Sequence, residues 1–171
     1  MKALVCYVSK TGNTRKVAEA LFQALTCEKA LSPLEEVGAL SGYDLVFLGF
    51  PIWEFGPAEP AREFLESRVA GTKVALFLTH AMPSAGAPQA MSFLDRILGR
   101  CRRLAQGANV LGLFHCRGEL SAEMAEGMAR SDNPMLQHFA STRPESLGHP
   151  DEGELQAARA FALQMLEAAK A

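Results

Sequence analysis

The sequence predicts an α/β domain in which a doubly wound parallel sheet of five strands carries helices on both faces. Short apolar runs alternate with segments of helical periodicity along the chain, an order typical of parallel sheets covered by helices. The apolar runs are continuous rather than alternating in polarity, which indicates strands buried on both faces. The length of 171 residues fits one domain, spanning residues 1–171.

Each element has its own signal in the sequence. The continuous apolar runs predict strands at Ala3–Val8, Leu45–Gly49, Val74–Leu78 and Val110–Phe114. A weaker strand is predicted at Glu28–Leu31, and its brevity suits a sheet edge. Helical spacing of apolar residues predicts helices at Asn13–Leu25, Pro57–Arg68, Ala87–Ala105 and Asp151–Lys170. The polar segment 117–150 is predicted to form an excursion with one or two short helices before the last helix.

Composition narrows the class of protein. Hydrophobic residues make up 49% and charged residues 21% of the chain, a balance that predicts a soluble globular protein with a buried core. A net charge of −2 is too close to neutral to predict a nucleic-acid partner. No signal peptide and no apolar stretch long enough for a membrane span are visible, so a cytoplasmic location without membrane association is expected. The four cysteines lack the spacing of a metal site and are expected to be reduced thiols. Oligomeric state is left open.

The loop after the first predicted strand has the composition of a phosphate site. It consists of Ser9, Lys10, Thr11, Gly12, Asn13 and Thr14 and leads directly into a predicted helix. Hydroxyl groups, unpaired amides and the dipole of a helix N-terminus all favour a phosphate monoester. The pattern is neither that of nucleoside triphosphate sites nor that of dinucleotide folds. Helix capping alone by Thr11 or Asn13 is the alternative interpretation.

A second candidate site is the loop that follows the third predicted strand, which contains the only tryptophan of the chain. Trp53 lies in the loop Gly49–Pro57, between prolines and glycines. An indole can stack on a flat, apolar ring such as an isoalloxazine and tune its redox potential. The alternative is a core tryptophan that covers the end of the sheet.

These two loops resemble those of the flavodoxin family, in the expected order along the chain. Ser9–Thr14 is similar to the family's phosphate loop, and Gly49–Trp53 resembles its first ring-contacting loop, while Tyr43–Gly49 is similar to its third strand. The resemblance extends over nearly the whole chain and implies the strand order 2-1-3-4-5 and FMN as cofactor. The residues that it implies for FMN binding are Ser9, Lys10, Thr11, Gly12, Asn13, Thr14, Pro51, Ile52, Trp53, Glu54, Phe55, Gly56, Thr79, His80, Ala81 and Met82. Within this set, the resemblance implies that Gly56 allows a peptide flip beside the ring.

The loop after the fourth strand departs from the family pattern. Residues 79–86 contain no tyrosine, whereas electron-carrying flavodoxins commonly place one there to cover the outer ring face. An open face would admit a substrate or nicotinamide. His80 is a candidate catalytic residue in this loop, since titration near neutrality suits proton transfer. A histidine that is simply hydrogen bonded at a strand end is the alternative, with at least equal weight.

Three functions follow from these features. The leading prediction is electron transfer by bound FMN to or from a redox partner protein. The rival is an FMN-dependent NAD(P)H:quinone-type reductase, favoured by the missing tyrosine and the weak net charge. The third, a scaffold without cofactor, is disfavoured by the two loops together. Cys116, beside Arg117 at the end of the fifth predicted strand, is either a redox thiol or, as we favour, inert packing.

Overall fold

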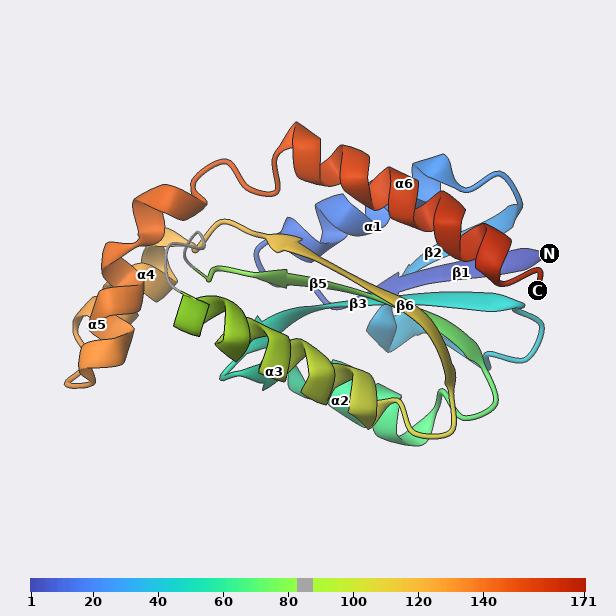
Figure 1. Cartoon of the computed structure of the whole chain (residues 1–171), viewed down its shortest axis with the longest axis horizontal. Helices are drawn as coiled ribbons and strands as arrows, with labels where there is room; N and C mark the ends of the chain where they lie inside the picture. The colour runs from blue at the N-terminus through green and yellow to red at the C-terminus, as the bar shows by residue number, and fades with distance from the viewer. Residues whose placement is uncertain (83–87) are drawn as a thin grey trace.

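The structure is a computed structural model of the chain, and it describes residues 1–82 and 88–171. One sheet forms its centre, with helices on both sides (Figure 1). The strands are β1 (Lys2–Tyr7), β2 (Glu28–Pro33), β3 (Leu45–Trp53), β4 (Gly56–Pro57), β5 (Lys73–His80) and β6 (Asn109–Arg117). The helices are α1 (Asn13–Ala24), α2 (Glu59–Ser67), α3 (Pro88–Leu104), α4 (Ala122–Ala129), α5 (Pro134–Ser141) and α6 (Glu152–Ala168), with 3-10 turns at Leu34–Glu36 and Arg143–Ser146.

The strand order confirms the predicted doubly wound arrangement. Five parallel strands follow the order β2-β1-β3-β5-β6, which is the predicted 2-1-3-4-5 once the short β4 is set aside. β4 pairs antiparallel with the end of β3 as a two-residue hairpin strand. The carboxyl ends of β1, β3, β5 and β6 therefore lie at one edge of the sheet.

Two apolar layers cover the faces of the sheet. Alternate residues of β1 point to opposite faces, so Leu4 and Cys6 join the layer under α2 and α3, whereas Ala3 and Val5 join the layer under α1 and α6. Figure 1 shows α1 and α6 on one side of the sheet and α2 and α3 on the other. β3 and β5 are buried on both faces, as their continuous apolar runs predict.

One prediction about the strands is wrong. The run Val110–Phe114 was expected to be buried on both faces, yet most of β6 is only partly buried. The physical reason is its position, because β6 is an edge strand that pairs only with β5. The other edge strand is β2, as predicted, and it runs two residues past its predicted end, to Pro33.

The segment between β6 and α6 lies outside the sheet and its covering helices. It contains α4 and α5, which pack against each other, and the 3-10 turn Arg143–Ser146. In Figure 1 this helix pair projects beyond the carboxyl edge of the sheet. None of the described helices has the length and apolar character needed to cross a membrane.

Candidate functional site

The loop after β1 lies at the amino end of α1 and supplies surface donors there. Gly12 precedes the helix with φ of +88°, a left-handed conformation that favours glycine. The hydroxyl of Ser9 accepts a hydrogen bond from the Arg15 amide at 3.3 Å. Ser9 is partly exposed and Thr11 is exposed, so both hydroxyl groups can be reached by a ligand. The first amides of α1 have no partner within the helix, and its first turn carries no acidic residue.

Thr14 has a different place from the other residues of this loop. Its side chain is 1% exposed, and its hydroxyl lies 2.8 Å from that of Thr79, which is 2% exposed. This buried pair joins α1 to β5. The hydroxyl of Thr14, predicted to hold phosphate, therefore serves the contact between helix and sheet in this structure.

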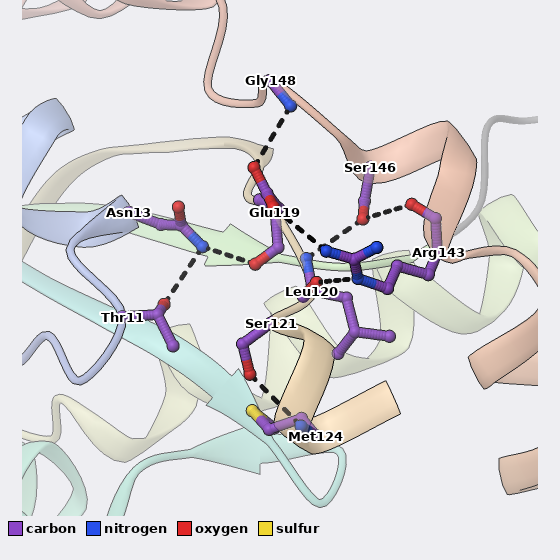
Figure 2. A network of polar contacts seen from close by, with 9 residues as sticks. All are labelled: Thr11, Asn13, Glu119, Leu120, Ser121, Met124, Arg143, Ser146 and Gly148. Carbon is purple, nitrogen blue, oxygen red and sulfur yellow. Dashed lines mark hydrogen bonds and ion pairs between the residues drawn. The ribbon is translucent and has the colours of Figure 1, made fainter. Parts of the chain in front are cut away.

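Asn13 connects the phosphate loop to the chain that follows β6. Its side-chain nitrogen Nδ2 donates to the hydroxyl oxygen of Thr11 at 3.2 Å and to the carbonyl oxygen of Glu119 at 2.9 Å. Figure 2 shows Asn13 between these two partners. Both amide hydrogens of Asn13 are thus engaged by the protein itself.

Trp53 lies next to the phosphate loop. It is the last residue of β3 and is partly buried. The ammonium group of Lys10 lies 4.3 Å from the centre of the indole ring, a favourable cation–π distance. The two predicted loops therefore meet at one edge of the sheet.

The segment around Trp53 is a hairpin rather than the open loop that was expected. β3 continues to Trp53, four residues beyond its predicted end, because β4 pairs with its last residues. The left-handed conformations fall on Glu54 (φ +44°) and Phe55 (φ +64°), and Gly56 pairs with Trp53. The positive φ angles that favour glycine are thus found one and two residues before Gly56. Phe55 packs edge-on against Phe93 with ring centres 5.2 Å apart.

His80 is buried at the end of β5 and contacts a second histidine. Its Nε2 lies 3.1 Å from Nδ1 of His115, and its Nδ1 accepts the amide of Met82 at 3.3 Å. Burial, together with the charges of His115 and Arg117, lowers the pKa of His80 to about 3. The expectation that His80 titrates near neutrality is therefore wrong, since the ring stays neutral there. Because Nδ1 accepts a hydrogen bond, the proton of the neutral ring lies on Nε2.

His80 orders the loop that follows β5. The amide of Met82 is held by its ring, and Met82 is itself buried. Ala81 and Met82 are thus positioned at the same edge of the sheet as Trp53 and the phosphate loop. The rest of this predicted loop, residues 83–87, lies outside the described residues.

Cys116 has the properties of a packing residue. It is 6% exposed, and burial, reinforced by the nearby carboxylates Glu154 and Asp151, raises the pKa of its thiol. A raised pKa leaves little reactive thiolate at neutral pH. Arg117 donates through Nη1 to the carbonyl oxygen of Glu145. The favoured interpretation of Cys116 as inert agrees with this environment.

The donors of the site fit a phosphate ester joined to a flat ring. Within residues 1–82 and 88–171, every buried side-chain nitrogen and oxygen has a hydrogen-bond partner. At this edge the groups that remain for a ligand are the hydroxyls of Ser9 and Thr11, the first amides of α1 other than that of Arg15, and the partly buried ring of Trp53. A phosphate needs donors and positive charge, and an aromatic ring needs a flat apolar face, so the set matches both requirements.

Three further residues of this edge had no role assigned from the sequence. His115, Glu119 and Arg143 all contact residues of the predicted loops or their neighbours. The one sequence feature that pointed to His115 and Glu119 was their position just after a predicted strand. Arg143 carried none, because it lies in the polar excursion.

Comparisons with known proteins agree with this geometry. A family model described as "Flavodoxin domain" matches residues 4–163. The flavodoxin-like domain-containing protein BilS of Clostridioides difficile is 31% identical over 97% of this chain and 97% of its own. A flavodoxin from the domain Archaea matches with a TM-score of 0.60 at 17% identity, covering all of both chains. The general stress protein 14 of Treponema denticola, solved in complex with FMN, matches with a TM-score of 0.60 at 13% identity, covering 96% of this chain and 99% of that one. This chain belongs to the flavodoxin domain family.

Proposed function

We propose that this protein binds one FMN at the carboxyl edge of its sheet and carries electrons to or from a redox partner protein. The observation that supports this most is the contact between Lys10 and the ring of Trp53. It brings a phosphate-type loop together with a partly buried aromatic residue at the same edge of the sheet, as FMN requires. Membership of the flavodoxin domain family points the same way, as does the FMN-bound structure of general stress protein 14, which shares the fold.

Each end of the cofactor would have its own residues. The hydroxyls of Ser9 and Thr11 and the first amides of α1 would hold the phosphate. Trp53 would flank the ring, and the backbone of Ala81 and Met82, ordered by His80, would face its polar edge. Bound FMN supplies the exchange of one or two electrons, while the protein supplies affinity, orientation and electrostatic tuning.

One observation favours FMN-dependent reduction by NAD(P)H as a second candidate. Neither tyrosine of the chain is free to cover the outer ring face. Tyr43 lies under Lys2 at the opposite edge of the sheet, and Tyr7 packs in the layer under α1 and α6. A flavin with an open face can accept a hydride from a nicotinamide. An electron carrier does not need such an open face.

The first test is titration of the flavin-free protein with FMN, followed by visible absorption and flavin fluorescence. We expect a perturbed flavin spectrum and quenched fluorescence, and no spectral change would contradict FMN binding. Anaerobic addition of NADH or NADPH to the loaded protein then separates the two candidates. A carrier keeps its visible flavin band, whereas a reductase loses it without any further protein.

The Trp53→Ala variant tests the ring contact. Aromatic stacking contributes about 0.5–1.5 kcal/mol, so the dissociation constants of FMN and riboflavin should both rise by about twofold to tenfold. Equal effects on both ligands are expected because riboflavin has the ring without the phosphate. Tyr43→Ala is the matched control, since Tyr43 also has a lysine over its ring but lies at the far edge. Unchanged flavin affinity in Trp53→Ala would remove Trp53 from the site.

A further inference from the structure

The chain after β6 is held between the phosphate loop and the last turn of the excursion. On one side, the carbonyl oxygen of Glu119 accepts the hydrogen bond from Asn13. On the other side, the amide of Glu119 donates to the carbonyl oxygen of His149 at 2.9 Å. The Glu119 backbone therefore joins two segments that are far apart in sequence. Figure 2 shows the bond to Asn13.

Gly118 brings this chain into close contact with Asn13. Its amide donates to the carbonyl oxygen of His80 at 2.9 Å, which fixes it at the end of β5. A Cβ atom at position 118 would lie 2.8 Å from Nδ2 of Asn13 and 2.9 Å from its Cβ and Cγ. These distances are too short for any real contact, so only glycine leaves Asn13 in its present position.

Leu120 is held by the 3-10 turn at the end of the excursion. Its amide donates to the hydroxyl of Ser146 at 3.0 Å, and its carbonyl oxygen accepts from Nε of Arg143 at 3.0 Å. The Ser146 hydroxyl in turn donates to the carbonyl oxygen of Arg143 at 2.8 Å. Ser146 is 3% exposed and Leu120 is 4% exposed, so the bond between them is shielded from water. Figure 2 shows this turn next to Glu119.

The side chain of Glu119 adds a weaker contact with residues 143–149. Its carboxylate lies 3.5 Å from Nη2 of Arg143 and accepts the amide of Gly148 at 3.3 Å. Both members of the ion pair are about one-third exposed, and such pairs contribute little. The connection depends mainly on the hydrogen bonds that the backbone of Glu119 and Leu120 makes with Asn13, Arg143, Ser146 and His149.

The bond from Asn13 has a direct consequence for Thr11. A hydroxyl group has one donor hydrogen and two acceptor lone pairs. Because the oxygen of Thr11 accepts from Asn13, its hydrogen is free to point to another acceptor. Thr11 is exposed, so that acceptor is a ligand atom or water. Asn13 therefore orients the hydroxyl hydrogen of Thr11. The two amide hydrogens of Asn13 are themselves donated to Thr11 and Glu119.

We propose that residues 118–120 and residues 143–149 form a latch that acts through Asn13 to orient Thr11 toward the phosphate of FMN. Asn13 is a positioning residue in this arrangement, and its role depends on the excursion that carries Ser146. The inference rests on the proposed function for its ligand. The latch itself is a property of the protein chain, so it can be tested without flavin.

Binding of FMN and of riboflavin separates the latch from the ring site. Gly118→Ala displaces Asn13, and Ser146→Ala removes the partner of the Leu120 amide, although neither residue is among those that would contact FMN. Loss of one oriented hydrogen bond corresponds to a change of about threefold to tenfold in the dissociation constant. We expect that rise for FMN in both variants and an unchanged constant for riboflavin. Gly127→Ala is the control, because Gly127 lies in α4 of the same excursion with open space around it.

Hydrogen exchange supplies the flavin-free measurement. In the Asn13→Ala variant without flavin, the amides of Glu119 and Leu120 should exchange faster than in the wild-type protein, because the latch has lost its anchor. If wild-type protein binds no FMN, the proposed function fails and the latch is judged on this exchange alone. Unchanged exchange in Asn13→Ala would overturn the latch. The latch would also be overturned if Ser146→Ala left the dissociation constant of FMN unchanged, or raised the constants of FMN and riboflavin equally. If Gly118→Ala does not fold, Ser146→Ala alone decides the binding test.

Discussion

His80 shows how burial changes the chemistry of a single residue. Its folded pKa is about 3, and its ordinary value is 6.5. Between these two values the unfolded chain binds a proton that the folded protein excludes, so the free energy of unfolding falls as the pH is lowered through this range. The stabilisation is fully present above about pH 6.5 and is lost on the way to about pH 3. The pKa of His115 is lowered as well, mainly by burial, and adds to the same dependence.

The His80→Gln variant tests this pH dependence. For one proton the slope is about 1.4 kcal/mol per pH unit, so the wild-type protein should lose about 1–2 kcal/mol between pH 7 and pH 5. The variant should lose measurably less over the same range, as followed by urea unfolding. His138→Gln is the control, because His138 is exposed on α5. An identical slope in wild type and His80→Gln would contradict the assignment.

Gly49 is required by packing inside the sheet. A Cβ atom there would lie 2.0 Å from the ring of Phe77, which is fully buried. Overpacking of this kind costs about 1–3 kcal/mol or more, so Gly49→Ala should lower the urea midpoint sharply. Gly38→Ala is the matched control, since Gly38 is exposed and has open space around it. Equal urea midpoints for the two variants would show that the side chains around Gly49 can move aside to accommodate a methyl group.

At the scale of elements, the start of α6 is fixed by a capping box. The carboxylate of Asp151 accepts the amide of Glu154 at 2.8 Å, and the carboxylate of Glu154 accepts the amide of Asp151 at 2.8 Å. Glu154 also accepts the amide of Arg117 and lies 2.6 Å from Nδ1 of His149. The same carboxylate therefore ties α6 to the end of β6.

Removal of the Asp151 cap should destabilise the protein measurably. An N-cap carboxylate replaced by alanine costs about 1 kcal/mol, so Asp151→Ala should lower the free energy of unfolding by that amount. Asp151→Ser should recover most of the loss because serine is also a good N-cap. Denaturant titration of the three proteins checks this order. Equal stability of Asp151→Ala and wild type would mean that the cap contributes nothing to the fold.

At the scale of the whole molecule, α6 completes one of the two apolar layers. Its buried residues Ala158, Ala162, Met165 and Leu166 face α1 and the sheet. A chain that ends at residue 150 would expose this layer, and burial of apolar surface is the main favourable term in folding. We expect that chain to lose its cooperative thermal transition in circular dichroism. A chain without the exposed Lys170 and Ala171 should melt as the 171-residue chain does.

The parts of the site that local sequence encodes were predicted well. The loop Ser9–Asn13 and Trp53 do lie at one edge of the sheet, because parallel strands bring their carboxyl ends together once the strand order is known. The roles of Thr14 and His80 were not predicted, since each depends on how much of the side chain is buried. Burial is set by the elements that pack above a residue and not by its neighbours in sequence.

Hydrophobic periodicity and loop composition are local signals, and by themselves they determined the five parallel strands, the main helices and the place of the loop Ser9–Thr14. The strand order and the family came from the resemblance of two loops to the flavodoxin family. Only the tertiary structure decided which side chains meet. Thr14 and Thr79 are separated by 65 residues, His80 and His115 by 35, and Asn13 and Glu119 by 106. Such contacts depend on strand register and on the path of the excursion, which no local pattern contains. The latch beside the phosphate loop is therefore a property of the folded chain alone.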